Sequence, residues 1–424
     1  MQQVVILGGG LTGLTAAYEL AKKGLKPLVL EKEKDLGGLA GYFEHDGFKL
    51  EKFYHHIFQS DTAIIDLSKE LGLDNNLKFR TSKNAMYYND KLYNITKPLD
   101  ILKLPIFTAL DRIKLAKALA YLKLSNFESW MEDKSADSWL ADEFGENVQK
   151  VLFRPLLESK FGRFHTDVPL TWFWARLKFR TVKLGYWDND GFSLLIEGLK
   201  EKIEELGGQV LTGVEVKKVD ATNTPIKIET NKKNFETEKL ISTLPLAVSF
   251  KLIQGFFYEF AKDYLSQPYY HALNLVLLLK EPISSYYWVS LHNLDEEFLA
   301  WINHTNLVPA EQYGGLHPVY LANYLPIDDV RFTLNTDQLL KRYEKTLYKI
   351  APDYDPKLIV KKFSFVGPYG QPIVGLNHGE KVAPIETPLE NVYLASMSQV
   401  YPQDRGTNYA VDLGQKAADT VLKN

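Results

Sequence analysis

The 424-residue sequence contains no cysteine. Structural disulfides, disulfide-relay chemistry and cysteine-ligated iron–sulfur clusters are therefore excluded. The nine histidines are scattered, and the adjacent pair His55–His56 lacks the spacing that places two ligands on one helix face. The sequence therefore predicts no metal site.

An excess of charge and a long apolar run are also lacking. The 50 Lys and Arg residues nearly balance the 53 Asp and Glu residues, and the formal net charge of −3 gives no case for nucleic acid or an anionic membrane as a partner. No apolar run reaches the roughly 18–20 residues of a membrane-spanning helix. Met1 lies two residues before the first predicted strand, so we expect no N-terminal signal and a cytoplasmic location. The length suggests two or three domains.

Glycines are concentrated between an apolar run and a helical pattern. Residues 4–7 read as a buried strand, and residues 14–21 carry apolar side chains at helical spacing. Between them, Gly8, Gly10 and Gly13 fit G-x-G-x-x-G. Gly8 would permit the tight turn, Gly10 the approach of a diphosphate, and Gly13 close packing of helix on strand. The stretch predicts a dinucleotide site, although the motif alone also fits a simple turn.

An acidic residue at the end of the second predicted strand supports the dinucleotide interpretation. Glu31 lies 18 residues after Gly13, where a carboxylate can bind ribose hydroxyls, and an acid there disfavours a 2′-phosphate. Leu11 and Thr12 at the helix start join the predicted cofactor-binding residues, because free N–H groups at a helix N-terminus attract phosphate. Lys32, the neighbour of Glu31, is also assigned to the cofactor site. The alternative is that Glu31 is an ordinary solvated charge.

A second glycine pair, Gly37–Gly38, follows this strand. With the first motif it resembles the flavin amine oxidase superfamily, which includes protoporphyrinogen oxidases, carotenoid desaturases and UDP-galactopyranose mutases. The resemblance implies FAD, with Gly37, Gly38 and Leu39 against its diphosphate. Many members carry an arginine two residues before the pair and another just after it, where this chain has Asp35 and Leu39. The subfamily therefore stays open.

The resemblance extends over essentially the whole chain and implies an α/β fold. It predicts a discontinuous Rossmann-type, glutathione-reductase-like FAD domain from residues 1–60, 190–245 and 365–424. A helical substrate or lid region, residues 61–189, and an α+β substrate domain, residues 246–364, would be inserted into it. The sequence predicts a hairpin at 227–245, a long strand at 269–282 in a separate sheet, a helix at 337–356, and a helix with Ser135 as its N-cap.

The resemblance also assigns cofactor contacts in the later segments. Val216 would meet the adenine, Ser396 would lie near the ribityl chain, and the run Arg405, Gly406, Thr407 would open a helix toward the pyrimidine edge of the flavin. Free N–H groups at that helix start could stabilise negative charge on the flavin. The alternative for the last three residues is a capped C-terminal helix without a cofactor role.

The segment "LEKFYHHIFQSD", residues 50–61, resembles the H-I-F loop of UDP-galactopyranose mutases. The resemblance implies that His56 lies beside the flavin ring, where a histidine can hydrogen-bond or shuttle a proton near neutral pH. His55 would be its structural neighbour. The alternative is that both histidines are core residues satisfied by backbone groups.

Basic residues alternate with aromatic ones in residues 152–180. Arg176 and Arg180 stand four residues apart on a predicted helix, and Trp172 precedes Arg176 by the same interval. Such a face suits an anionic, planar or diphosphate-bearing substrate, and we assign both arginines to the catalytic site. Alternatively, the basic residues of this stretch pair with acids on a solvated face. The basic residues of this stretch are Arg154, Lys160, Arg163, Arg176, Lys178 and Arg180. Tyr369, Gln371 and Tyr401 are candidates for lining the same cavity.

The leading hypothesis is an FAD-dependent oxidoreductase of the protoporphyrinogen oxidase and desaturase type, in which a small organic substrate gives a hydride to flavin N5. The alternative is a redox-neutral sugar-nucleotide mutase, which the H-I-F loop and the arginines favour. A flavin-binding protein without turnover is a third hypothesis. The substrate is expected to be anionic, apolar or a nucleotide sugar. Residues 98–124 leave open a peripheral membrane contact or, equally, a buried helix pair.

Overall fold

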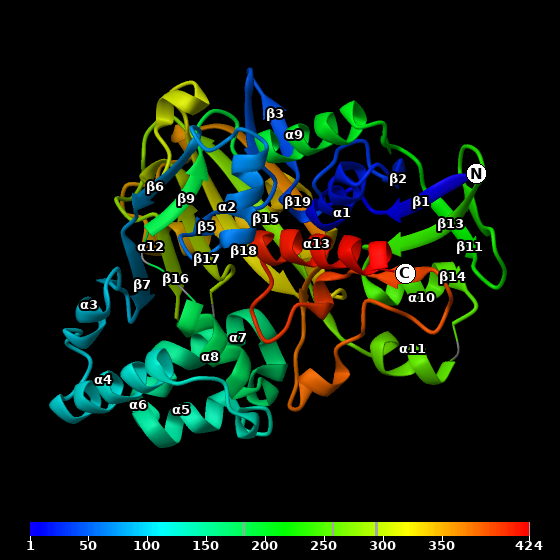
Figure 1. Ribbon diagram of the computed structural model, residues 1–424. Helices are drawn as coiled ribbons and strands as arrows, with labels where there is room; N and C mark the ends of the chain where they lie inside the picture. Colours follow the sequence, from blue (N-terminus) through cyan, green and yellow to red (C-terminus); the bar gives the residue numbers. More distant parts are fainter. Residues whose placement is uncertain (180, 182, 257, 293–295, 424) are drawn as a thin grey trace.

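The computed structural model describes residues 1–179, 181, 183–256, 258–292 and 296–423. Two large sheets stand side by side, and a group of helices forms a separate lobe below the second sheet in the view of Figure 1. Both the first and the last helix of the chain lie on the first sheet. The fold is therefore mixed α/β, as the sequence predicted, with both parallel and antiparallel pairing.

The first sheet is parallel from β10 to β13 and antiparallel from β13 through β12 to β11. Its short central strands are buried on both faces, which explains their unbroken apolar sequences. The predicted hairpin at 227–245 is confirmed as two antiparallel strands of this sheet. In spatial order the strands are β10 (Gln209–Leu211), β2 (Pro27–Leu30), β1 (Gln2–Leu7), β13 (Phe235–Ser242), β12 (Ile226–Thr230), β11 (Val216–Asp220) and β14 (Ile253–Gln254), and β20 (Val392–Leu394) also pairs with β13.

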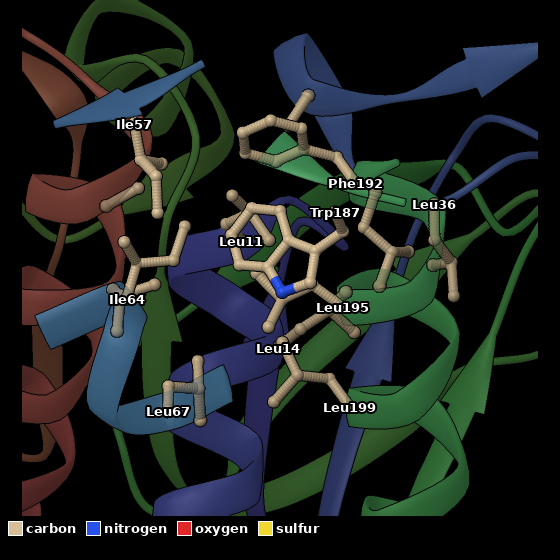
Figure 2. Close-up of a cluster of buried hydrophobic side chains, with 14 of the residues drawn as sticks. Leu11, Leu14, Leu36, Ile57, Ile64, Leu67, Trp187, Phe192, Leu195 and Leu199 are labelled. Atoms are coloured by element: carbon tan, nitrogen blue, oxygen red, sulfur yellow. The ribbon is translucent and has the colours of Figure 1, made fainter. Parts of the chain in front are cut away.

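Helices from both ends of the chain cover one face of this sheet. Helix α1 (Leu11–Lys22) packs against α9 (Phe192–Glu205) and α13 (Thr407–Lys423), and α13 packs against α2 (Thr62–Glu70). Figure 2 shows the core that results, with Trp187 and Phe192 between leucines of α1 and α9 and the side chains of Ile64 and Leu67 from α2. This packing fixes the start of α1 relative to the start of α13.

The second sheet is larger and mostly antiparallel. The predicted strand at 269–282 is confirmed as its long strand β15, which lies next to one edge. The helix predicted at 337–356 is confirmed as α12 (Thr336–Ile350), which packs on β15 and ends six residues earlier than expected. Two of its strands come from the first quarter of the chain, and one of them pairs in parallel with β16. In spatial order the strands are β19 (Ile359–Pro372), β15 (Tyr269–Leu279), β18 (His317–Leu325), β17 (Ala300–Asn303), β16 (Trp288–Leu291), β7 (Asn84–Tyr88) and β8 (Lys91–Asn94).

Residues 61–189 contain strands as well as helices. The helical lobe has its own apolar core, and the predicted N-cap is confirmed, because Ser135 Oγ accepts a hydrogen bond from Ser138 N. Two small sheets complete the fold: β3 (Tyr42–His45) with β4 (Phe48–Glu51), and β5 (Ile57–Phe58) and β6 (Leu77–Thr81) on either side of β9 (Lys183–Trp187). The lobe comprises α3 (Pro98–Leu102), α4 (Ala109–Leu124), α5 (Ala136–Phe144), α6 (Glu146–Val148), a π-turn (Gln149–Phe153), α7 (Arg154–Phe161) and α8 (Leu170–Phe179).

Helix α4 carries apolar side chains on both of its faces. Leu115 and Leu122 are buried in the lobe, whereas Leu110, Ile113 and Leu124 point to solvent. The sequence left open a buried helix pair at 98–124, and in the structure one face of α4 is buried while its other face is exposed. In the part of the chain that the structure describes, no helix combines the length and apolar character needed to cross a bilayer.

Candidate functional site

Of the three motif glycines in the turn between β1 and α1, Gly10 has space for a side chain, whereas Gly8 and Gly13 have none. Gly8 has a φ of +104°, and a Cβ there would lie 2.6 Å from Thr243 Oγ1. A Cβ on Gly13 would lie 2.0 Å from the Gly8 carbonyl oxygen, which is a backbone atom and cannot move aside. A Cβ on Gly10 would meet no atom within 4 Å. The turn therefore presents bare backbone at the N-terminus of α1, directly beside the open space over Gly10.

Glu31 closes the side of this turn. Its Oε2 accepts a hydrogen bond from Gly9 N at 2.7 Å, and its Oε1 accepts one from Glu33 N at 2.9 Å. These two bonds hold the carboxylate at the end of β2, beside the turn. Lys32, in contrast, is largely exposed and pairs with the equally exposed Glu33, at 3.4 Å. The glutamate is therefore fixed in place, and the lysine is not.

The glycine pair after β2 connects the turn to the second sheet. Gly37 N donates to the Gly9 carbonyl at 2.8 Å, and Gly10 and Gly37 form an isolated parallel bridge. The side chain of Leu39 then lies against Gly367 of β19, because a Cβ on that glycine would be 2.8 Å from Leu39 Cδ2. The N-terminus of α1 is thus connected to β19 through the Gly10–Gly37 bridge and the Leu39 side chain, and we call this connection the glycine path.

Four charged residues meet near the far end of β19. Asp404, in the loop before α13, pairs with Lys160 Nζ of α7 at 2.8 Å and with Arg176 Nη1 of α8. Arg405 adjoins Asp404 in sequence. The side chains of Lys160, Asp404 and Arg176 are only 13%, 14% and 19% exposed. We call these four residues the cation cluster.

Gln371 of β19 holds two members of the cation cluster together. Its Oε1 accepts hydrogen bonds from Arg405 Nε at 3.1 Å and from Lys160 Nζ at 3.4 Å. Its Nε2 donates to the Pro372 carbonyl at 3.0 Å, which fixes the orientation of the amide. The sequence singled out Gln371 only as a candidate for cavity lining, and the structure places it between a helix of the lobe and the start of α13.

Aromatic rings flank the cation cluster on two sides. Arg176 Cζ lies 5.6 Å and Lys160 Nζ 5.9 Å from the ring centre of the fully buried Trp172. Arg405 Cζ lies 4.8 Å and Lys160 Nζ 5.7 Å from the ring centre of Tyr324. The predicted contact between Trp172 and the arginine that follows it is confirmed. These rings reduce the access of water and stabilise the cations through their π faces.

The charges of the cation cluster perturb one another. Burial lowers the pKa of Lys160; Arg176 adds to this effect, and Asp404 opposes it. Burial alone would raise the pKa of Asp404, but attraction to Lys160, Arg176 and Arg405 outweighs burial and holds the pKa below its usual range. Burial would likewise raise the pKa of the Tyr324 hydroxyl, yet Arg405 and Lys160 lower it. Positive potential therefore dominates this part of the molecule.

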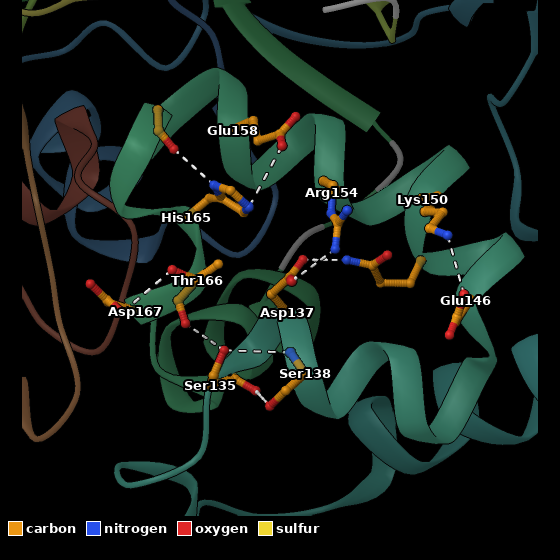
Figure 3. Close-up of polar contacts among 12 residues, drawn as sticks. Ser135, Asp137, Ser138, Glu146, Lys150, Arg154, Glu158, His165, Thr166 and Asp167 are labelled. Carbon is orange, nitrogen blue, oxygen red and sulfur yellow. Dashed lines mark hydrogen bonds and ion pairs between the residues drawn. The ribbon is translucent and has the colours of Figure 1, made fainter.

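The remaining basic residues of 152–180 lie elsewhere. Arg154 pairs with Asp137 at 3.3 Å inside the helical lobe, as Figure 3 shows, and Arg163 stacks on the ring of Phe164. Lys178 donates to the Ser125 carbonyl at 2.7 Å. Arg180, predicted to share a face with Arg176, lies outside the described residues. Arg176 itself pairs with an acid 228 positions away in sequence rather than with a neighbour on a solvated face.

His56 is linked to the cation cluster through aromatic side chains. Its Nδ1 lies 3.1 Å from the Tyr287 hydroxyl, and its ring packs edge-on against Trp288 with centroids 6.3 Å apart. Trp288 in turn contacts Tyr54 at 5.0 Å, and Tyr54 hydrogen-bonds Tyr324. His56 and the cations therefore lie at opposite ends of one aromatic wall.

His55 has different surroundings. Its Nδ1 lies 2.6 Å from the Phe53 carbonyl oxygen, and its ring packs on Phe192 at the start of α9. Burial lowers the pKa of His55 to about 4, and the positive charge of Arg405 acts in the same direction. This imidazole is therefore neutral at neutral pH, donating its Nδ1 proton to the carbonyl.

A buried carboxylate near the site was not singled out from the sequence. Glu51, at the end of β4, is fully buried and accepts hydrogen bonds from Phe192 N at 2.8 Å and from the Tyr186 hydroxyl at 2.7 and 2.9 Å. Burial raises its pKa to about 7, against the effect of these hydrogen bonds. The sequence of β4, Phe48-Lys49-Leu50-Glu51, mixes apolar and charged residues and therefore does not distinguish a buried carboxylate from an exposed one.

The other predicted cofactor residues lie along the same side of the first sheet. Val216 begins β11, and Ser396 is buried just after β20, where its N donates to Gln399 Oε1 at 2.6 Å. Gly406 precedes Thr407, the first residue of α13, and a Cβ on Gly406 would lie no closer than 3.7 Å to another residue. The backbone at the start of α13 is thus accessible, as it is at the start of α1.

Short parts of the chain are similar in sequence to curated proteins. A 79-residue stretch is 39% identical to the 15-cis-phytoene desaturase of Arabidopsis thaliana, covering 18% of this chain and 14% of that protein. The stretches that match curated relatives span between 8% and 22% of those relatives' lengths. These short matches are to one part of each relative, so the activity of the whole relative is not transferred by them.

Among the solved structures similar to this chain over its whole length, two show the likeness in fold. A reduced UDP-galactopyranose mutase has a TM-score of 0.79 at 17% identity, covering 100% of this chain and 96% of its own. A protein from Exiguobacterium sp., provisionally named protoporphyrinogen oxidase, has a TM-score of 0.77 at 16% identity, covering 100% and 99%. At these identities the likeness shows the fold alone. The family model of the flavin-containing amine oxidoreductases matches residues 11–422, so the chain belongs to this family and its cofactor is FAD.

Proposed function

We propose that the protein is an FAD-dependent oxidoreductase of the protoporphyrinogen oxidase and desaturase type, acting on a small organic substrate. The observation that carries the proposal is the turn between β1 and α1. Steric contacts exclude a side chain at Gly8 and Gly13, whereas nothing lies within 4 Å of the Cβ position of Gly10. Such a turn fits a diphosphate at a helix N-terminus.

The first sheet and its helices form the proposed Rossmann-type, glutathione-reductase-like FAD domain, built from residues 1–60, 190–245 and 365–424. Residues 61–189 and 246–364 form the proposed substrate-binding parts. In support, the glycine path joins the turn after β1 of the first sheet to Gly367 on β19 of the second sheet. The residues proposed to hold the cofactor are Gly8, Gly10, Leu11, Thr12, Gly13, Glu31, Lys32, Gly37, Gly38, Leu39, Val216, Ser396, Arg405, Gly406 and Thr407.

When bound, FAD supplies a two-electron acceptor for hydride at N5. The chain itself has to bind and orient the substrate and keep water away. The aromatic wall formed by Tyr54, Trp288 and Tyr324 excludes water, and Arg176 in the cation cluster positions the substrate. His56, at the other end of the wall, is the proposed hydrogen-bonding or proton-transferring group.

A redox-neutral reaction of the sugar-nucleotide mutase type is the alternative. The surplus of cations beside Asp404 favours it, because a diphosphate would suit that charge. The aromatic wall suits either a planar apolar substrate or the nucleobase and sugar of a sugar nucleotide. Both reactions would use the same cofactor-binding residues and the same cation cluster.

Anaerobic mixing of candidate substrates with the oxidised, FAD-loaded protein tests the proposal. We expect loss of the flavin absorption in a single turnover with a true substrate, and its return when an electron acceptor is admitted. A substrate that turns over only with pre-reduced enzyme, without net oxidation, would establish the mutase reaction instead. Protein that retains FAD but turns over no candidate in either state would contradict both.

A further inference from the structure

We infer that the cation cluster is a binding site for an oxyanion group of the substrate that carries two negative charges, such as a phosphate ester or a dicarboxylate. This inference rests on the proposed function only in placing the substrate beside β19. Asp404 is the internal counter-ion that holds the cations in position until the ligand arrives.

The first argument is the charge balance. Lys160, Arg176 and Arg405 face one another with Asp404 as the one carboxylate that forms ion pairs with them in the described parts of the chain, which leaves a net charge of +2. Burying an uncompensated charge is costly, and a structural ion pair would be balanced. The surplus is therefore explained by a ligand that brings the missing negative charge.

The second argument is that hydrogen-bonding capacity is left unused inside the cation cluster. Arg176 Nε is buried and has no hydrogen-bond partner in the described structure. An arginine presents several donors in a planar fork that suits the two oxygens of a phosphate or carboxylate. A buried donor without a partner is rare in proteins, so this N–H points to a missing acceptor such as an oxyanion.

The third argument is pre-organisation. Gln371 fixes Lys160 and Arg405 through one oxygen, and its own amide is locked by the Pro372 carbonyl. The three cations come from the neighbouring helices α7 and α8 and from the loop before α13, which is more than two hundred residues further along the chain, so distant segments are held at one point. A site ordered before the ligand binds loses less entropy on binding.

The position of the site relative to the cofactor path supports a substrate ligand. Gln371 follows Gly367 by four residues in β19, and Gly367 is the position against which Leu39 packs. Gly367 and Gln371 pair with Ala272 and Tyr270, which are two positions apart on β15, because the register shifts between them; roughly 7 Å therefore separates the two positions along the sheet. The cation cluster thus lies next to the glycine path, within reach of a substrate bound there, and it shares Arg405 with the proposed cofactor site.

The test measures binding of two simple anions to the FAD-loaded protein: inorganic pyrophosphate and malonate. Dissociation constants come from Trp fluorescence and from the rise in melting temperature with anion concentration. Arg176→Gln and Lys160→Gln should each weaken binding of the preferred anion at least about tenfold, because each removes a charge-assisted hydrogen bond. Tighter binding of pyrophosphate or of malonate identifies the phosphate or the carboxylate source. Arg163→Gln, which changes an exposed arginine outside the cluster, should bind as the unaltered protein does.

Asp404→Asn gives the sharpest result. Removing the internal counter-ion should lower the melting temperature without anion and strengthen anion binding about tenfold, so that added pyrophosphate restores stability. A residue that only maintained the fold would give weaker binding, and that outcome would overturn the role assigned to Asp404. Arg176→Lys keeps the charge and should retain most of the affinity at low salt.

Unaltered affinity in both Arg176→Gln and Lys160→Gln would overturn the inference, as would the absence of saturable binding to the unaltered protein. If a glutamine variant fails to fold, Arg176→Lys and the salt dependence of binding decide the question in its place. Trp fluorescence needs no turnover, so anion binding by a protein that oxidises no substrate would contradict the proposed function and leave the site intact.

Discussion

The turn between β1 and α1 and the cation cluster around Asp404 differ in what holds them. In the turn, the Thr243 side chain leaves no room for a Cβ at Gly8, and the Gly8 carbonyl leaves none at Gly13. The cation cluster is assembled from segments more than two hundred residues apart and is held by charge. The first is fixed by steric contact and suits a ligand common to a whole family. The cation cluster depends on a few side chains that single substitutions can change, and it suits a ligand particular to one enzyme.

Substitutions at Gly13 and Gly10 should separate folding from cofactor binding within the turn, with the largest expected effect. Gly13→Val forces a side chain onto the Gly8 carbonyl and should destabilise the protein by about 3 kcal/mol or more. Gly10→Val enters open space, so the FAD-free protein should melt as before while FAD retention is lost. Thermal melts of FAD-free protein and the FAD content after gel filtration measure the two effects. Normal FAD content in Gly10→Val would show that the turn has no cofactor role.

Glu51→Gln tests whether a buried charge with full hydrogen bonding behaves differently from the cation cluster. The pKa of Glu51 is raised to about 7 in the folded state, above its value of about 4.3 in an unfolded chain. Ionisation thus costs folding energy, and stability should fall as the pH rises from about 4.5 to 7, by an amount on the order of 3 kcal/mol. Denaturant unfolding from pH 4.5 to 8 should show this loss in the unaltered protein but not in Glu51→Gln. Glu44→Gln, at an exposed site on β3, serves as the control, and equal pH slopes in both variants would contradict the prediction.

Arg176→Gln should affect catalysis more than folding. Loss of the guanidinium should lower kcat/KM by a factor that corresponds to about 1–3 kcal/mol, with FAD still bound, because Arg176 contacts Asp404 and Trp172 rather than the glycine path. Steady-state kinetics with the substrate found by flavin bleaching measure the change, with Arg163→Gln as the matched control. Unchanged kinetics alongside a lower melting temperature would make Arg176 a structural residue.

His56→Ala, compared with His55→Ala, probes the end of the aromatic wall opposite the cations. We expect His56→Ala to slow flavin reduction or reoxidation at least about tenfold, or about 1.4 kcal/mol, and to shift the flavin absorption bands. His55→Ala should lower the melting temperature more than the rate, because His55 is bonded to the Phe53 carbonyl and packed on Phe192. Stopped-flow absorbance and thermal melts of both variants supply the data. Equal and small rate changes would assign both histidines to packing.

The sequence predicted the turn and its surrounding elements because their signals are local. Apolar runs, the helical spacing after Gly13 and the distance to Glu31 are all visible within the first 31 residues. The contact between Trp172 and Arg176 was equally local, since four residues make one helical turn.

The partners of the cations could not be predicted in the same way. Asp404 lies 228 positions from Arg176, and the sequence offered nearer acids as partners. Gln371 was a candidate for cavity lining, but its bonds to Lys160 and Arg405 depend on how β19 docks against α7 and α13. Burial of Glu51 likewise depends on α9 and on Tyr186, which approach it from another part of the chain. Tertiary packing, rather than local preference, decides these contacts.

The pairing of distant segments has a consequence for how the chain reaches its native state. Helix α1 packs against α13, and β7 pairs in parallel with β16, so neither sheet region is complete when its first strands leave the ribosome. Contacts of such long sequence separation form slowly, because loop closure must precede them. The nascent N-terminal half therefore exposes apolar strands until the C-terminal helix has been made, and we expect synthesis in cells to depend on chaperones that hold these strands apart.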